Sequence, residues 1–294
     1  MNAKRRLTPT ATALVAAALA AHAAGAPPTP PPGQDRKESL AALTKIAAGY
    51  RVMPGSGGAA ELDEEPAIRW NKPVSNIKDA AMFFWMREGR PVAAGTFLWQ
   101  GGSGLYHEFQ SLVPGPLRAE RDGKPVWGTV KPGVTFAPVP GAPAPADVRN
   151  KRLVQMKTLA EGFRTEAIKS PPFYGENSVY KFRLLPRPLV RYADPVRPER
   201  EGAVFAFVQD TDPEVLLILE NRAHAGGTRW EFALAPMMGW QAKGWYKDLE
   251  VWSVGRQHPA HDPAQPYFVA GPFPVDGEWE AAVSRGRPTG GGPK

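Results

Sequence analysis

Two segments of the chain carry apolar residues at the three- and four-residue spacing of an amphipathic helix. The first lies within LAALTKIAAGY and the second within LVQMKTLAEGF. Their apolar positions are Leu40, Leu43, Ala47 and Tyr50 in the first, and Leu153, Met156, Leu159, Ala160 and Phe163 in the second. Each set predicts one helix with a single apolar face, and Asp147 is the candidate N-cap of the second.

Short runs rich in β-branched and aromatic residues follow each predicted helix. In the first half they are AMFFWM, VAAGTFLW and LYHEFQSL; in the second they are AVFAFVQ, EVLLILE, TRWEFALA and DLEVWSV. Turn signals such as REGRP, QGGSG and DTDP separate them, which predicts antiparallel strands joined as a meander. The continuous apolar run VLLIL predicts a strand that is covered on both faces.

The two halves match each other at nearly constant offsets. LAALTKIAAGYRV from Leu40 aligns with LVQMKTLAEGFRT from Leu153, an offset of 113 residues. AIRWNKPV and AMFFWM align with LVRYADPV and AVFAFV at an offset of 122 residues, and HEF and VW meet WEF and VW further on. The same matches in the same order predict an internal duplication, with chance similarity of amphipathic segments as the alternative.

The expected fold is therefore α+β. We predict a tandem duplication in which each copy has one helix followed by an antiparallel meander of about four strands, with the copies packed about a pseudo-twofold axis. The predicted divisions are copy 1 at 35–129, a proline- and glycine-rich strap over the surface at 130–147, copy 2 at 148–255, a C-terminal extension at 256–284 and a disordered tail at 285–294.

The N-terminus has the three parts of a secretory signal peptide. Lys4, Arg5 and Arg6 precede a short apolar run, and Ala21-His22-Ala23 forms a cleavage site. Residues 1–23 are therefore predicted to be a signal peptide and 24–34 a proline-rich spacer, which places the mature protein in the periplasm or outside the cell. No later run is long and apolar enough to predict a transmembrane segment in the mature chain.

Charge and composition narrow the possible partners. Cleavage would remove three basic residues and no acidic ones, which lowers the formal charge from +7 to +4. This charge is too small, and the basic residues too scattered, to predict nucleic-acid binding. The chain has no cysteine, which excludes disulfides, thiolate metal sites and cysteine nucleophiles.

The sequence contains no recognisable set of catalytic residues. The HPAHD segment has two histidines but no identifiable third ligand, so neither a metal nor a cofactor is predicted. No phosphate-binding loop, dinucleotide fingerprint or nucleophile elbow occurs, and no catalytic residue is assigned. The QDTDPE segment offers Asp210 and Asp212 as calcium ligands or acid–base groups, although a turn of the Asp-Pro kind is the simpler explanation.

Six residues are the candidate ligand contacts. Four are charged residues that match between the halves, and they form either structural ion pairs or part of a groove between the copies: Arg69 with Arg191, and Glu108 with Glu231. The other two are Trp240 and Trp245, which we place in a connection between strands. By contrast, Trp230 and Trp252 have counterparts in the first half and are expected to belong to the framework.

The R-W/Y-x-x-P-V segments and the strands that end in HEFQSL and RWEFALA resemble those of a group of uncharacterised, predicted-exported proteins of planctomycete bacteria. The resemblance covers about Leu40 to Val254 and implies a bacterial, exported setting without an activity. Two main functional classes stay open. One is an exported non-catalytic binding or envelope-associated protein with an unknown ligand or envelope partner, and the other is an extracellular hydrolase that uses paired carboxylates, with carbohydrate as a suitable substrate. A purely structural envelope component is a third possibility.

Overall fold

The computed structural model describes residues 34–274, apart from 56, 102, 171–176, 197–200 and 258–259, and the side chains from residue 37 onward. The predicted signal peptide, the tail and all but the last residue of the predicted spacer lie outside the described residues.

Antiparallel strands make up most of the described chain, together with two α-helices and one short 3-10 helix. In the first half the elements are α1 (Gln34–Ala48), β1 (Tyr50–Pro54), β2 (Glu61–Leu62), β3 (Ile68–Lys72), η1 (Pro73–Ser75), β4 (Ile77–Arg87), β5 (Arg90–Gln100), β6 (Gly104–Ser111), β7 (Leu117–Arg121), β8 (Lys124–Thr129) and β9 (Ala137–Pro138).

The second half has the same kinds of elements. They are α2 (Arg149–Glu161), β10 (Phe163–Lys169), β11 (Ser178–Lys181), β12 (Arg183–Leu184), β13 (Val190–Ala193), β14 (Glu201–Gln209), β15 (Asp212–His224), β16 (Gly227–Pro236), β17 (Gln241–Tyr246), β18 (Leu249–Val254) and β19 (Tyr267–Phe273). The predicted α+β class, with two helices and antiparallel sheets, is confirmed.

Both helices end two residues earlier than the apolar pattern predicts, at Ala48 and Glu161. The amide of Gly49 donates to the carbonyl of Ile46 at 3.1 Å, and Tyr50 then begins β1 instead of completing α1. In the same way Gly162 follows α2, and Phe163 begins β10. The aromatic rings stay in the core because the strand starts directly beneath its helix, so the spacing alone could not separate helix from strand.

The predicted N-cap of α2 is also wrong. Val148 is the N-cap residue, and no side chain caps this end of the helix. The guanidinium group of Arg152 instead donates to the carbonyls of Ala146 and Asp147, at 3.0 and 2.7 Å, and so ties the preceding loop to the first turn.

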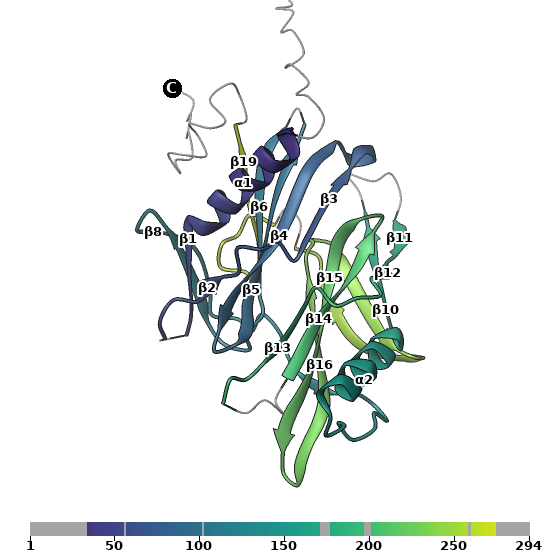
Figure 1. Cartoon of the computed structure of the whole chain (residues 1–294). Helices are drawn as coiled ribbons and strands as arrows, with labels where there is room; N and C mark the ends of the chain where they lie inside the picture. Colours follow the sequence, from purple (N-terminus) through teal and green to yellow (C-terminus); the bar gives the residue numbers. More distant parts are fainter. Residues whose placement is uncertain are drawn as a thin grey trace, which may run out of the picture.

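Two six-stranded sheets form the centre of the molecule. The first has the order β19-β6-β5-β4-β2, with β3 also paired to β4; the second has the order β12-β14-β15-β16-β9, with β13 also paired to β14. A three-stranded sheet, β1-β7-β8, accompanies the first, and a four-stranded sheet, β11-β10-β17-β18, accompanies the second. Figure 1 shows the resulting halves, one in blue with α1 and one in green with α2.

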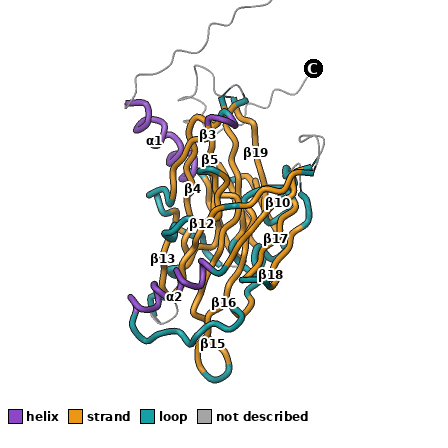
Figure 2. The backbone as a smooth tube through the Cα atoms, turned by 90° about the vertical axis from the view of Figure 1, so that its right-hand side faces the viewer, coloured by secondary structure: helices purple, strands orange, loops and turns teal. Residues whose placement is uncertain are grey.

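Alternation along the strands creates three apolar cores. On β4, Phe83 and Trp85 pack with α1 and the three-stranded sheet, whereas Met82 and Phe84 face the second six-stranded sheet. The second half has its own outer core around α2, which contains Trp230. Figure 2 shows that strands fill the molecule, with both helices toward the left of that view.

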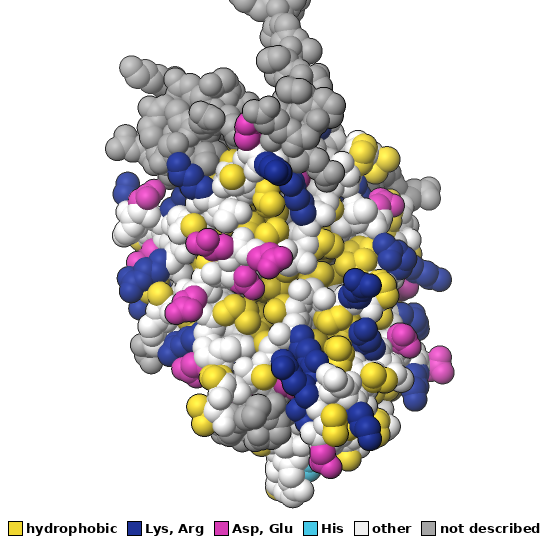
Figure 3. Space-filling model, in the orientation of Figure 1, with side chains coloured by type: hydrophobic (Ala, Val, Ile, Leu, Met, Phe, Trp, Pro, Cys, Tyr) yellow, Lys and Arg dark blue, Asp and Glu magenta, His cyan; other side chains and the backbone are white. Residues whose placement is uncertain are grey.

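The inner core lies between the two six-stranded sheets. It contains buried residues from β4 and β5 on one side and from β14, β15 and β16 on the other. Partly buried apolar residues that pack against it include Ile68, Leu189 and Val190. In Figure 3, apolar side chains gather between the two halves on the face shown, and charged side chains surround them.

Each half receives an edge strand from outside its own meander. The strap contributes β9, which pairs with β16 at Phe232, and the C-terminal extension contributes β19, which pairs with β6 at Phe109. The prediction that the strap runs over the surface is wrong for part of it, because Val134 and Val139 are buried. These two insertions bring chain that follows one half into a sheet of the other.

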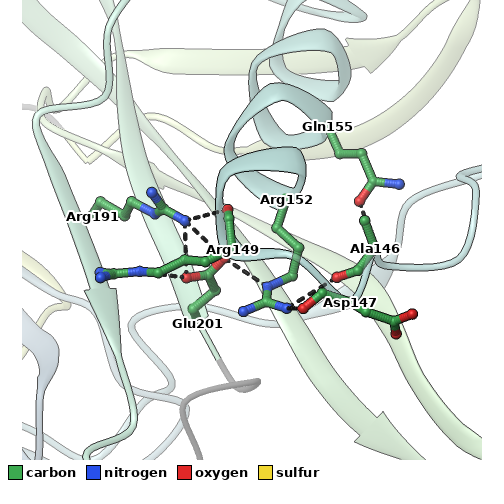
Figure 4. A network of polar contacts seen from close by, with 7 residues as sticks. All are labelled: Ala146, Asp147, Arg149, Arg152, Gln155, Arg191 and Glu201. Carbon is green, nitrogen blue, oxygen red and sulfur yellow. Dashed lines mark hydrogen bonds and ion pairs between the residues drawn. The ribbon is translucent and has the colours of Figure 1, made fainter.

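Buried ion pairs hold each helix against its six-stranded sheet. Arg69 on β3 forms a bidentate ion pair with Asp79 on β4, in which Nε and Nη2 donate to the two carboxylate oxygens at 2.8 and 2.5 Å. The hydroxyl of Ser39 on α1 also donates to Asp79. In the second half Glu201 accepts from Arg191 and Arg152, and Arg149 lies at 3.4 Å (Figure 4). The side chain of Glu201 is fully buried, so its charge depends on these arginines.

Replacing Glu201 by Gln should destabilise the fold by about 3 kcal/mol or more, because it leaves the buried Arg152 without its counter-charge. Urea denaturation at neutral pH measures the change. The matched control is Glu88→Gln, since Glu88 is also paired with an arginine but its side chain is 81% exposed. The control should stay within about 0.5 kcal/mol of wild type. Equal effects of the two substitutions would show that the buried network does not stabilise the fold.

Candidate ligand cleft

A cleft of about 740 Å³ opens at one end of the inner core, where the two six-stranded sheets separate. Both sheets and the C-terminal extension contribute to it. The polar and aromatic lining residues are Gln100, Ser103, Tyr106, Glu108, Asp212, Glu214, Trp240, His261 and Tyr267.

The alternation of β6 places Glu108 in this cleft. His107 is buried beside Tyr50 in the outer core, with its Nδ1 atom 2.7 Å from the Tyr50 hydroxyl, and Phe109 packs in the same core. Glu108 lies between these two residues in the strand, so its side chain points to the opposite face. A hydrogen bond links it to the side chain of Tyr267, and among the described residues no lysine or arginine pairs with it.

Burial, together with the charges of Asp212 and Glu214, raises the pKa of Glu108 well above its usual range. The same burial, and the charge of Glu108, also raise the pKa of Tyr267. Burial and the neighbouring carboxylates thus both disfavour the ionised form of Glu108.

The turn between β14 and β15 positions the other two carboxylates. Asp210 adopts a left-handed conformation, with φ of 57°, in the predicted QDTDPE turn, and Asp212 then begins β15. Lys72 lies 3.6 Å from Asp212 and 3.9 Å from Glu214, and Lys169 lies 3.5 Å from Glu214. Even with these lysines nearby, burial and the charge of Glu214 raise the pKa of Asp212 to about 7.

Of the two candidate tryptophans, only Trp240 lines the cleft. It is 9% exposed, and the guanidinium carbon of Arg256 lies 5.1 Å from its ring centre. Trp245 was predicted to lie in a connection, but it belongs to strand β17 in the outer four-stranded sheet. There Arg164 stacks over its ring at 4.0 Å, so Trp245 packs with its own sheet.

The four matched charges separate into different environments. Arg69 and Arg191 pair with Asp79 and Glu201, so the predicted partners, Glu108 and Glu231, are wrong for both arginines. Each acidic partner lies on the adjacent strand, two residues from the position that pairs with the arginine. Strands β6 and β16, which carry Glu108 and Glu231, are not adjacent to β3 or β13. Glu231 accepts from Arg229 at 2.8 Å and from Arg222 at 3.0 Å, and it does not line the cleft. Glu108 alone of the four lines it.

Sequence reasoning missed Glu214 and Tyr267. Glu214 stands two residues after Asp212 in the predicted turn, so that segment did carry a signal for it. Tyr267 comes from the extension, and only the pairing of β19 with β6 brings it to the cleft.

Nothing in the described part of the chain forms a group of three or more histidine, aspartate and glutamate side chains placed to hold a metal ion. His261 lines the cleft, but its Nδ1 atom lies 2.8 Å from the carbonyl of Val269. Among the described residues, neither helix has the length and apolar character that crossing a membrane requires.

Comparisons of the chain with protein-family models, with curated proteins and with solved structures find no match.

Replacing Asp212 by Asn should stabilise the fold more at about pH 8 than at about pH 4. The pKa of Asp212 is about 7 in the folded chain, against about 3.9 in an unfolded one. The folded state therefore binds the extra proton, and stability falls as the pH rises through this window. The variant lacks this loss, so relative to wild type it should gain up to about 4 kcal/mol across the window.

Urea denaturation of both proteins at several pH values measures this difference. Asp248→Asn, at an exposed turn position, is the control and should follow wild type at every pH. Parallel pH profiles for Asp212→Asn and wild type would contradict a raised pKa at Asp212.

Proposed function

We propose that the protein is an exported, non-catalytic binding protein whose ligand enters the cleft around Glu108, Asp212 and Glu214. The carrying observation is that three carboxylates line one cleft and that Glu108 has no cationic partner among the described residues. Carboxylates that a fold merely needs for stability are paired, as Glu201 is here with its arginines. Strongly perturbed groups in a cleft are typical of functional sites.

The charges and rings of the cleft favour a ligand with one ammonium group. Lys72 and Lys169 face Asp212 and Glu214, so Glu108 has no cationic partner in the described chain when its carboxyl group ionises. A single ammonium group would supply the missing charge. Trp240 and Tyr106 add aromatic faces, which attract cations through their π electrons.

Duplication of one ancestral unit accounts for this architecture, and two sets of contacts support it. At the 122-residue offset, Arg69 and Asp79 correspond to Arg191 and Glu201, and the two pairs bridge equivalent strands. At the 113-residue offset, Ser39 corresponds to Arg152, and each donates to the acidic residue of its pair. None of these acidic partners contributed to the sequence match.

The strand pairing supports the same origin. Strand β1 pairs with β7, and β7 with β8, just as β10 pairs with β17 and β17 with β18. The exchanged strands β9 and β19 pair with the matched residues Phe232 and Phe109, which suits a pseudo-twofold axis between the halves. A self-alignment no better than those of shuffled sequences would contradict this origin.

Export is supported by the n-region, apolar run and cleavage pattern of residues 1–23. It agrees with the resemblance to exported planctomycete proteins. N-terminal sequencing of the protein secreted from a bacterial host should find a mature chain that begins after Ala23.

Butylammonium and 1-butanol test the proposed ligand class, because they differ mainly in charge. Isothermal titration calorimetry at about pH 8, with tryptophan fluorescence as a second readout, should detect binding of butylammonium only. Glu108→Gln should weaken it by about tenfold or more. Affinity should fall as the pH drops through about 7, because Asp212 takes up a proton.

The matched control is Glu250→Gln, since Glu250 is a half-exposed carboxylate paired with Lys243 on the outer sheet. It should bind butylammonium as wild type does. Equal binding of the alcohol, or unchanged affinity in Glu108→Gln, would contradict a cation site.

A hydrolase is the second candidate, and the raised pKa values of Glu108 and Asp212 favour it. A carboxyl group that is protonated near neutral pH can act as a general acid beside an ionised carboxylate, as glycoside hydrolysis requires. A panel of 4-nitrophenyl glycosides tests this activity. If wild type turns one over, Glu108→Gln and Asp212→Asn should each lose about a hundredfold or more, and the protein would be an enzyme.

A further inference from the structure

A second cleft, of about 690 Å³, opens at another part of the boundary between the halves. Arg87 and Arg90, at the hairpin between β4 and β5, line it from the first half, and Arg222 on β15 lines it from the second. Three guanidinium groups thus line this cleft together with four carboxylates, Glu88, Asp194, Glu201 and Glu220, whereas no arginine or lysine of the described chain lines the cleft around Glu108.

A buried carboxylate fixes two of these arginines. Arg90 donates from Nε and Nη2 to one oxygen of Glu220, at 3.0 and 2.5 Å, and Arg222 donates from Nη1 to the other at 2.7 Å. Tyr192 also donates its hydroxyl to Glu220, whose side chain is 7% exposed. Glu220 therefore sets the planes of both guanidinium groups before any ligand arrives.

Arg222 keeps a donor for a ligand, because its Nη2 has no acceptor among the described residues. Arg90 also has a side-chain hydrogen bond with Tyr192, and the side chains of Arg90 and Arg222 remain 40% and 33% exposed. Arg222 is further held by Glu231 and by the ring of Phe136, 4.2 Å away. An arginine held on one edge and open on another is suited to bind an oxyanion.

Arginines outside the lining offset the acidic lining residues, which outnumber the lining arginines by four to three. Arg90, Arg222 and Arg229 surround the two carboxylates Glu220 and Glu231, which leaves one positive charge in excess. Glu201 faces Arg149, Arg152 and Arg191, which leaves two more. Glu88 pairs with Arg87, and Asp194 subtracts one charge. This end of the boundary is therefore positive.

We propose that Arg87, Arg90 and Arg222 form an anion-binding site that takes a carboxylate or phosphate group of a small ligand. The guanidinium forks match the planar or tetrahedral oxygens of such groups, and the buried Glu220 holds the forks in position. The site is separate from the cleft around Glu108 and does not depend on the function proposed for that cleft.

Titration with inorganic phosphate and with butyrate, at constant ionic strength, tests this site and distinguishes the two anions. Calorimetry on the full mature protein should show saturable binding of at least one, and the tighter of the two identifies the group. Arg90→Gln should raise the Kd by about tenfold or more. Arg90→Lys keeps the positive charge but lacks the planar guanidinium group, so its Kd should lie between those of wild type and Arg90→Gln.

Arg118→Gln is the matched control, because Arg118 is an exposed arginine on β7 outside both clefts. It should leave the Kd unchanged, and Arg90→Gln should leave butylammonium binding unchanged. Thermal melting should confirm that each variant is folded. If neither anion binds wild type, or if Arg118→Gln weakens binding as much as Arg90→Gln, the site does not exist. If folded Arg90→Lys has the same Kd as wild type, the guanidinium geometry plays no role in binding.

Discussion

Apolar packing between the two six-stranded sheets is the interaction on which the rest of the structure depends. Met82 and Phe84 from one sheet share a core with Leu216 and Ile218 from the other, and all four are almost completely buried. Burial of such side chains contributes about 1.5 to 3 kcal/mol each. Because twisted sheets stay in contact over a limited length, the packing gives way to clefts where they separate. Both clefts lie along this boundary between the halves, so the interaction that stabilises the fold also determines where the candidate sites open.

Buried charges then fix the outer layers on this core. Asp79 and Glu201 each accept hydrogen bonds from a neighbouring strand and from a helix, so one carboxylate positions an arginine and an α-helix together. These carboxylates have several partners, and Glu201 is fully buried. Glu108 differs, because within the described chain its hydrogen-bond partner is a tyrosine and no cation pairs with it. The fold therefore gives some carboxylates several cationic partners and another carboxylate none, which is the distinction that separates framework from candidate site.

The sequence predicted the two helices, the antiparallel meander and the importance of the matched arginines, because these follow from local periodicity and from spacing. It placed Tyr50 and Phe163 in the helices, but each begins a strand. Their rings lie beneath the helix ends, so they keep the apolar spacing of a helix although the backbone is already that of a strand. The partner of Arg69 was also wrong, because a diagonal contact across β3 and β4 depends on register, which apolar patterns do not define. The cleft could not be predicted at all. It combines Glu108, Asp212 and Tyr267, and only the exchange of strand β19 brings the last of these into place.

On the proposed duplication, function is expected where the two halves differ. At the 122-residue offset, Arg90 and Val92 of the arginine cleft correspond to Asp212 and Glu214 of the acidic cleft, while Leu98 and Gln100 correspond to Glu220 and Arg222. Equivalent positions thus carry opposite or different charge on a shared scaffold. The residues kept in both halves, such as Arg69 and Arg191, instead join strands and helices. If the fold was built twice, it must repeat the contacts that stabilise it, so charges matched between the halves belong to the framework. The proposed ligand sites would then have become distinct once the two copies no longer had to remain alike, which allowed arginines to line one cleft and a carboxylate without a cationic partner in the described chain to line the other.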